Sequence, residues 1–509
     1  MHAGIHLPEN AAPSPPDAAA GRLPLFNVVG FTGHRELADA AGAALAIREA
    51  LAFLVRELPG EWIALSSIAR GGDQLFVAEA RAAGMSWHGI LPLARAEFER
   101  DFAPAEWAAV EATLETADHL RVIHEYGDRE DSYLDCGIET VNGCDVLLAY
   151  WDGNDARGKG GTGQVVQYAK AIGKPVLIID PATRAVRREN WDKLQVGDAI
   201  LADLNALPEA PFTGGENPFA APDSVLRFQH KCDWHASQGA PHFRRLIVAT
   251  VMSHVMATLI ATATVAYALH MLVLPWAKLV FVTFGLVAAL ALRRHLRSHH
   301  SWVRCRLAAE FCRSALATWG LPRAAPLLQD LDLVGARRLT RALYVLHTRS
   351  SVTRNLPIEE FKPIYLAKRI DDQIAYFNRQ VNKALPVYRR LMAGFWIATL
   401  LAVACIASYA VTRTAGIAVP LWVEETAFVF LQISLPVVAA SLISIISIND
   451  LQRRVARYQE MRALLSANRA EVAACLTWNS LEHIVLKTER VLLQEVIEWH
   501  SLRSFAESP

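Results

Sequence analysis

Glycine-rich turns with polar or cationic side chains follow three expected strands in the first third of the chain. They lie at 30–35, 70–73 and 159–164. Glycine lets backbone N–H groups approach an anion closely, and a helix N-terminus adds partial positive charge. Arginine and lysine supply cations for phosphate oxygens. We therefore predict a site for a phosphorylated or nucleotide ligand. Its residues are Thr32, Gly33, His34, Arg35, Arg70, Gly71, Gly72, Asp73, Lys159, Gly160, Gly161, Thr162, Gly163 and Gln164.

The elements that must position these turns alternate between short apolar strands and alanine-rich helices. The strands are expected at 25–31, 62–68, 88–91, 120–124, 146–151 and 175–179. This alternation predicts an α/β domain over about 23–180, with a mostly parallel sheet covered by helices on both faces. Ligands bind such sheets beyond the carboxyl ends of the strands, which is where the three turns lie.

Four long apolar runs occupy the second half of the chain, at 246–269, 275–292, 391–411 and 426–448. Lys278 is the single charged residue within them. A helix needs about 20 apolar residues to cross the hydrocarbon core, and the runs pair across short breaks. We therefore predict an all-α membrane domain at 244–509, with four transmembrane helices in two hairpins and cytoplasmic helices beside them. A linker at 181–243 joins it to the α/β domain.

Lysine and arginine are distributed very unequally around the two hairpins. Seventeen lie within 20 residues of the outer ends of the hairpins, and two lie at the inner ends, Lys278 and Arg413. The positive-inside rule then places both termini and the middle segment in the cytoplasm. We expect a multi-pass protein of the inner, cytoplasmic membrane. Residues 1–22 are rich in Pro and Ala and lack an apolar core, which predicts a disordered tail and no signal peptide.

The overall composition excludes several classes of protein. Hydrophobic residues make up 52% of the chain and charged residues 20%, which excludes a wholly soluble enzyme. The 51 basic and 51 acidic residues balance, so a nucleic-acid partner is not expected. The seven cysteines show no spacing typical of a metal site or a disulfide scaffold, and we predict no metal.

The glycine turns resemble those of the SLOG domain, a Rossmann-like superfamily with the LOG nucleotide phosphoribohydrolases and several nucleotide sensors. The matching segments are Thr32-Gly33-His34-Arg35, Gly71-Gly72-Asp73 and Gly160-Gly161-Thr162-Gly163, within about 23–180. The resemblance implies a Rossmann-like fold and a nucleotide-derived ligand, an ADP-ribose derivative or a cyclic nucleotide, with no other cofactor.

One departure from the LOG pattern bears on catalysis. Gln164 stands where that family's loop has threonine, and Gln167 stands where it has a glutamate. An amide can hydrogen-bond a sugar hydroxyl, but it cannot act as a general base. The departure favours binding over turnover, so we assign no catalytic residue.

The membrane domain resembles the SLATT family, whose members act as transmembrane effectors beside SLOG domains. The matching segments are 306–310, 365–376 and 489–499. The resemblance implies a homo-oligomer that kills or arrests an infected cell in bacterial antiphage defence. One helix face would carry Tyr365, Arg369, Asp372, Gln373 and Tyr376. It is either a polar contact between subunits or a solvated face with two anchored aromatic rings.

A polar stripe runs along the first transmembrane helix. Thr250, His254, Thr258 and Thr262 recur every four residues and so share one face. In an oligomer this stripe could line a pore, and an ionisable group within a span favours that interpretation. The alternative is that each hydroxyl bonds the carbonyl of the preceding turn or packs helices together.

These observations together predict a cytoplasmic sensor of a nucleotide second messenger fused to a membrane effector that opens a pore or disrupts the bilayer. Two alternatives stay open. One is a membrane-anchored hydrolase of nucleotides or ADP-ribose derivatives, with Asp73 or His34 as acid or base. The other is a nucleotide-gated ion channel of ordinary physiology.

Overall fold

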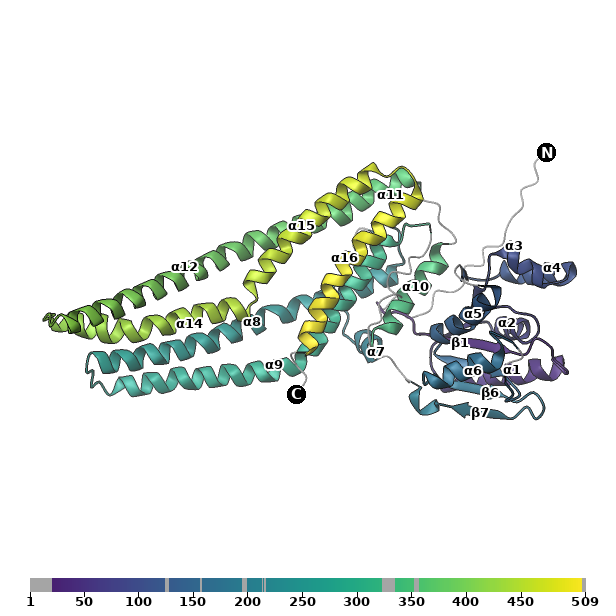
Figure 1. Cartoon of the computed structure of the whole chain (residues 1–509), viewed down its shortest axis with the longest axis horizontal. Coiled ribbons are helices and arrows are strands. Elements are labelled where there is room, and N and C mark those ends of the chain that lie inside the picture. Colours follow the sequence, from purple (N-terminus) through teal and green to yellow (C-terminus); the bar gives the residue numbers. More distant parts are fainter. Residues whose placement is uncertain are drawn as a thin grey trace. The chain divides into compact units, whose positions relative to one another are not determined.

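The computed structural model describes residues 21–123, 128–155, 158–194, 199–212, 214, 217–322, 335–351 and 357–505, with the backbone only at 199, 239–244, 294–301, 351 and 499–505. The expected disordered tail falls almost entirely outside these residues. Contacts divide the chain into two compact units (Figure 1). The first lies within Met1–Leu207, Pro222–Val225 and Arg323–Arg354, and the second within Pro208–Ala221, Leu226–Pro322 and Asn355–Pro509.

The first unit contains a seven-stranded sheet in the order β4-β3-β2-β1-β5-β6-β7. All neighbouring strands are parallel except β6 and β7, which are antiparallel. The expected mostly parallel sheet is therefore confirmed, while β7 is an edge strand that the sequence analysis missed. The strands are β1 (Phe26–Gly33), β2 (Glu61–Ser66), β3 (Ser86–Leu91), β4 (His119–Val122), β5 (Val146–Tyr150), β6 (Val176–Ile179) and β7 (Val186–Glu189).

Helices cover both faces of the sheet because the strands are apolar on both sides. Successive side chains of a strand point to opposite faces. In β1, Val29 and Phe31 belong to the same apolar core as residues of α1 (Ala40–Glu57) and α2 (Gly72–Ala82). On the opposite face, a Cβ at Gly30 would lie 3.0 Å from atoms of Thr140 and Cys144, where α5 (Arg129–Gly143) ends. The remaining helices of this part are α3 (Arg95–Phe98), α4 (Pro104–Leu114), α6 (Thr162–Ala171) and α7 (Ala199–Asn205).

One helix of the first unit lies, in the sequence, between the two pairs of apolar helices. α10 (Arg337–Ser351) packs at the amino ends of the strands: Arg341 pairs with Asp145 just before β5 and donates to the carbonyl of Phe26 in β1 (3.1 Å). Arg349 pairs with Glu61 at the start of β2 (2.9 Å). The compact units therefore divide the chain differently from the expected boundaries at 180 and 243, because α10 joins the sheet across more than a hundred residues.

The second unit is helical and contains four helices long and apolar enough to cross a membrane, as expected. The candidate spans are Arg245–Ala266, Val273–Arg293, Ile358–Thr414 and Leu421–Ala474. They fall within α8 (Asp223–Ala266), α9 (Val273–Thr318), α11 (Ile358–Tyr365), η5 (Leu366–Asp371), α12 (Asp372–Thr414), α13 (Leu421–Val423), η6 (Glu424–Leu431), α14 (Gln432–Ile448) and α15 (Leu451–Ala474). The last helix is α16 (Trp478–Phe505).

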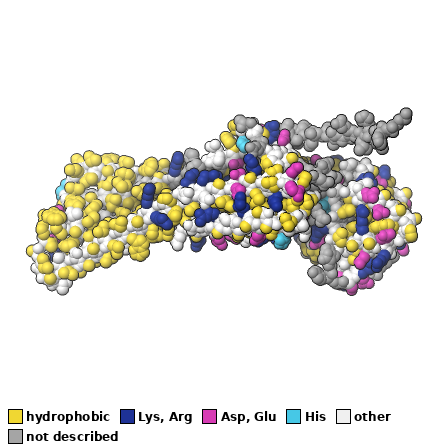
Figure 2. Space-filling view, turned by 90° about the horizontal axis from the view of Figure 1, so that it is seen from above, with side chains coloured by type: hydrophobic (Ala, Val, Ile, Leu, Met, Phe, Trp, Pro, Cys, Tyr) yellow, Lys and Arg dark blue, Asp and Glu magenta, His cyan; other side chains and the backbone are white. Residues whose placement is uncertain are grey.

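Large apolar side chains cover the outside of these spans. Trp276, Leu279, Val280, Leu400 and Trp422 are each more than half exposed. Figure 2 shows hydrophobic side chains forming most of the surface of the long helices. A patch of this extent is rare on soluble proteins and fits the hydrocarbon core of a bilayer. The side of the membrane on which the termini lie stays a prediction.

Candidate functional site

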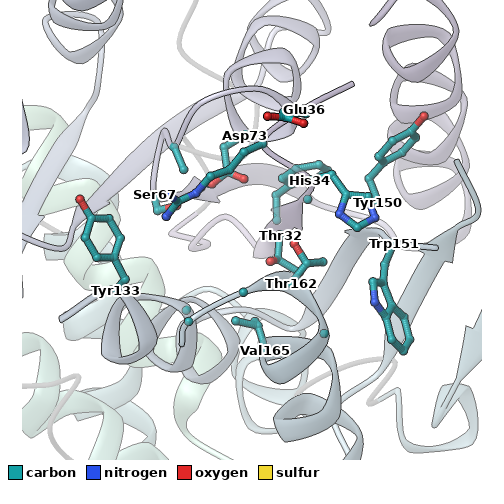
Figure 3. A pocket seen from close by; sticks show the side chains of 18 of the residues that line it. Thr32, His34, Glu36, Ser67, Asp73, Tyr133, Tyr150, Trp151, Thr162 and Val165 are labelled. Carbon is teal, nitrogen blue, oxygen red and sulfur yellow. The ribbon is translucent and has the colours of Figure 1, made fainter. Parts of the chain in front are cut away.

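A cavity of about 560 Å³ opens at the carboxyl ends of β1 and β5. The strand order reverses there, since β1 lies between β2 and β5, and open α/β sheets bind ligands at such a reversal. Tyr133 stands at one end of the cavity, and Tyr150 and Trp151 stand at the other, with Thr32 and Thr162 between them (Figure 3). This volume is in the range of ordinary small-ligand sites, roughly 300–1,000 Å³.

Most of the residues that the sequence singles out meet in this cavity. Those that line it are Thr32, Gly33, His34, Arg35, Asp73, Lys159, Gly160, Gly161, Thr162 and Gly163. Four others do not line it: Arg70, Gly71, Gly72 and Gln164. Each of these four has a structural contact elsewhere.

The Gly71-Gly72 turn supports the loop after β1. Gly71 has a φ of +84°, and a Cβ there would lie 2.2 Å from the carbonyl oxygen of Arg35. The N–H of Gly72 donates to the carbonyl of His34 (3.0 Å). Arg70 points away and pairs with Glu106 (2.6 Å). These glycines allow a close approach of two backbone segments, and they lie outside the cavity lining.

The second glycine loop leads into α6 at the cavity. Gly161 is the N-cap of this helix, with φ −70° and ψ 160°, and no side chain caps the first turn. The Gln164 side chain accepts the Gly160 N–H (2.7 Å), which closes the loop. Lys159 forms an ion pair with Asp131 of α5. The helix N-terminus is therefore positioned to receive an anion, while the lysine charge is already balanced.

Arg35 and Tyr133 also line the cavity. The Arg35 guanidinium lies 5.4 Å from the centre of the Tyr133 ring, within the range of a cation–π contact. The Gly160 backbone packs against Tyr133, since a Cβ at Gly160 would lie 3.1 Å from the Tyr133 Cβ. This part of the lining thus combines a cation and an aromatic ring beside the glycine loop.

A buried carboxyl group is among the residues that line the cavity. Asp73 of α2 is 4% exposed and accepts hydrogen bonds from the hydroxyls of Ser67 (2.5 Å) and Ser66 (3.3 Å). Burial raises the pKa of Asp73 to about 6, and the two serine hydrogen bonds and the Arg35 charge limit the rise. A carboxyl group with a pKa in this range can exchange protons near neutral pH.

His34 connects the ends of the two central strands. The backbone N–H of Asp152, two residues beyond β5, donates to His34 Nε2 (3.3 Å), and the Asp152 carboxylate lies 3.4 Å from the same atom. This contact brings the loop after β1 against the loop after β5. It holds two walls of the cavity together.

Several lining residues are absent from the sequence-based site. They are Glu36, Asp39, Ser67, Tyr133, Tyr150, Trp151, Asp152 and Asp155. Tyr150, Trp151 and Asp152 lie at the end of β5, so the rule that selected the glycine turns could have found them. Tyr133 lies on the first turns of α5, and nothing in its neighbours along the chain indicates a site. Gln167 does not line the cavity; its amide nitrogen lies 3.3 Å from Asp155 Oδ1.

No protein-family model matches the chain, and no curated protein sequence matches it. Among the described residues, no three His, Cys, Asp or Glu side chains are arranged to hold a metal ion.

The polar stripe of α8 is satisfied largely within its own helix. The hydroxyls of Thr250, Thr258 and Thr262 each donate to the carbonyl four residues earlier, at 2.9–3.0 Å. The His254 ring bonds the Thr250 carbonyl through Nδ1 (2.8 Å) and packs against Gly285 of α9. His254 nevertheless remains exposed on the single chain. Each threonine hydroxyl therefore bonds the carbonyl of the preceding turn, as the alternative to a pore predicts. Whether the stripe lines a pore stays a prediction.

Two of the three segments of the SLATT resemblance, 365–376 and 489–499, meet in a buried ion pair. Arg369 of η5 pairs with Glu489 of α16, which also accepts from Tyr365 (2.9 Å) and from Ser314 of α9 (2.8 Å). Next to Ser314, Glu310 lies between Arg306 (2.6 Å) and Arg313 (2.5 Å). Tyr365 and Arg369 are 0% and 4% exposed. The buried Tyr365 agrees with the alternative of a solvated face with two anchored aromatic rings. Both alternatives are wrong for Arg369, which is buried and pairs within its own chain. The side chain of Trp499 lies outside the described residues.

Proposed function

We propose that this chain senses a nucleotide-derived signal, an ADP-ribose derivative or a cyclic nucleotide, and responds through its membrane helices. The observation that carries the proposal is the cavity at the reversal of strand order, with the uncapped start of α6 on its border. A phosphate group fits that helix start, because the first N–H groups of a helix have no partner within it. The aromatic rings at both ends of the cavity offer stacking surfaces for a base.

Binding without turnover is the form of the proposal that the loop chemistry favours. The residue in the position of the LOG glutamate is Gln167, and it lies outside the lining. The ligand would then act by binding one arrangement of the chain better than another, since only a difference in affinity shifts an equilibrium.

The effector part of the proposal rests on the two apolar hairpins. Oligomers of the chain in the cytoplasmic membrane would open a pore or disrupt the bilayer when the signal binds. Such an activity fits bacterial antiphage defence, in which an infected cell is killed or arrested. A physiological nucleotide-gated channel has the same parts; reversible gating and sustained ion selectivity in a planar bilayer would identify it.

The test uses the full chain in detergent, incubated with a panel of ADP-ribose derivatives, cyclic dinucleotides and nucleoside monophosphates. Mass spectrometry identifies the bound and free species. Gly161→Asp and Gly161→Asn form a matched pair, since both side chains suit an N-cap with this backbone geometry and only the aspartate adds negative charge. We expect one intact ligand to be retained, lost in Gly161→Asp and kept in Gly161→Asn. No retention of any phosphorylated compound would contradict the proposal.

A second candidate is favoured by Asp73. Its pKa of about 6 and its position at the cavity fit a general acid or base, which is what a nucleotide hydrolase would need. The same experiment separates the two functions. Release of free base and sugar phosphate, abolished by Asp73→Asn, would make the chain an enzyme; an intact ligand in both proteins would make it a sensor.

A further inference from the structure

Four arginines gather on two neighbouring helices where the apolar part of the second unit ends. Arg389 and Arg390 directly precede the uncharged run of α12, and Arg453 and Arg454 lie in the first turn of α15. Figure 2 shows Lys and Arg side chains collected at the edge of the hydrophobic surface of the long helices.

The antiparallel register of α12 and α15 brings the two pairs to one level. Arg462 Nη1 of α15 lies 3.3 Å from Asn378 Oδ1 of α12. Arg469, seven residues later in α15, pairs with Asp371, seven residues before Asn378 (2.6 Å). Continued toward the membrane, this register places Arg453 and Arg454 opposite Val387 and Pro386. Arg389 and Arg390 lie two to four residues from these positions along α12, which is about 3–6 Å of helix rise, so the backbones of all four arginines lie within about one turn along the helix axes.

The positive charge of this cluster is mostly uncompensated. Arg389 and Arg390 are exposed, and neither makes an ion pair or hydrogen bond within the described part of the chain. Arg453 has only a distant partner, Asp450 at 3.9 Å, and its side chain is 86% exposed. The sequence between Asp372 and Glu424 contains no Asp or Glu. Four like charges so close together attract an anion strongly.

The cluster lies at the depth of lipid phosphates. The uncharged stretch from 391 to 412 ends at Arg413 and has 22 residues, which as a helix span about 33 Å, close to the hydrocarbon thickness. An arginine directly beyond that stretch reaches the headgroup region, and guanidinium groups bind phosphate oxygens in pairs.

We propose that Arg389, Arg390, Arg453 and Arg454 bind the headgroup of an anionic phospholipid. The phosphodiester accepts hydrogen bonds from the guanidinium groups, and the net negative charge of the lipid balances the cluster. This inference rests on the membrane location in the proposed function and goes beyond it by assigning a lipid partner to a defined set of side chains.

The experiment reconstitutes the full chain into nanodiscs of phosphatidylcholine and of phosphatidylcholine with an equal part of phosphatidylglycerol. Spin-labelled forms of both lipids report the ratio of their association constants with the protein. We expect a preference for phosphatidylglycerol, reduced at least about fivefold in Arg389→Gln/Arg390→Gln, the effect of losing about one interfacial arginine. Arg453→Gln/Arg454→Gln, which changes α15 instead of α12, should also lower the preference for phosphatidylglycerol.

The matched control is Arg462→Gln/Arg469→Gln, which removes the same charge from α15 further from the apolar surface. It should keep the preference. An equal loss in the control, no preference in the unchanged protein, or displacement of the lipid by millimolar inorganic phosphate would each overturn the lipid site. Failure to enter either type of nanodisc would instead overturn the membrane location, so the two proposals fail in different ways.

Discussion

Arg369 and Glu489 form a two-pronged ion pair in the interior of the second unit, with Nε–Oε1 at 2.8 Å and Nη2–Oε2 at 2.5 Å. Glu489 is 0% exposed and Arg369 is 4% exposed. The pair joins the π-helical segment before α12 to α16, and Ser314 brings α9 to the same carboxylate. Helices that continue into both apolar hairpins therefore share one buried charge pair.

Removing one partner of this pair should destabilise the second unit. Glu489→Gln leaves a buried guanidinium without its counter-charge, and the loss of one member of a buried pair costs roughly 3–5 kcal/mol. The measurement is denaturant unfolding of the full chain in detergent. Arg369→Met/Glu489→Leu removes both charges and should recover much of the loss, because an apolar pair of similar size needs no charge compensation. A double variant with a lower free energy of unfolding than Glu489→Gln would contradict this explanation.

Asp73 should make the stability of the first unit fall as pH rises from about 4 to about 6. Its pKa is raised from 3.8 to about 6, so in this window the unfolded chain has lost a proton that the folded chain keeps. The contribution of Asp73 to stability is therefore fully present below about pH 4 and is lost as pH rises through the folded pKa, by roughly 3 kcal/mol for a shift of this size. Asp73→Asn should remove this pH dependence. Compared with the unchanged protein, the variant should be relatively more stable at pH 7 than at pH 4.

The measurement for Asp73 is the free energy of unfolding at several pH values. Asp135→Asn, at an exposed position of α5, serves as the control and should follow the unchanged protein. If Asp73→Asn and the unchanged protein differ by the same amount at pH 4 and pH 8, the burial of an ionised Asp73 is not the cause.

Alanine should be tolerated less well at Gly71 than at Gly153. Both glycines have a similar φ, +84° and +88°, but a Cβ at Gly71 meets the Arg35 carbonyl, whereas a Cβ at Gly153 meets nothing within 4 Å. Gly153→Ala should cost about 1 kcal/mol from the backbone alone. Gly71→Ala should cost about 1–3 kcal/mol more, because the loop after β1 must move. Thermal unfolding compares the two, and equal losses would refute the close approach.

The Asp145–Arg341 pair should hold α10 on the sheet. Burial works to raise the pKa of Asp145, but Arg341 beside it keeps the pKa below its usual value. The pair therefore stabilises the folded unit above about pH 4, and this contribution is lost as pH falls through the folded pKa. Asp145→Asn removes the charge at neutral pH and should lower the hydrogen-exchange protection of α10 by about ten- to a hundredfold, as for a lost bond to a charged group.

The control for α10 is Glu61→Gln, which weakens the more exposed Arg349–Glu61 pair. Its effect on exchange should be several-fold at most, because exposed ion pairs contribute little. Unchanged protection of α10 in Asp145→Asn would show that the Asp145–Arg341 pair does not hold the helix on the sheet.

The sequence alone determined the strands, the four apolar helices and the glycine turns at the strand ends, because these depend on residues that are neighbours along the chain. Run length reveals a span, alternating segments reveal a parallel sheet, and strand ends indicate where a ligand binds. Thr32, Arg35 and Gly161, which line the cavity, were selected in this way.

Only the tertiary structure decided which of these residues meet. Gly71 and Gly161 look alike in the sequence, yet one packs against backbone and the other begins a helix at the cavity. Tyr133 enters the cavity because α5 packs beside the α6 loop. Arg341 reaches Asp145 across 196 positions, and Arg369 reaches Glu489 across 120. Contacts over such separations depend on how whole elements pack, and one sequence carries no local signal for them.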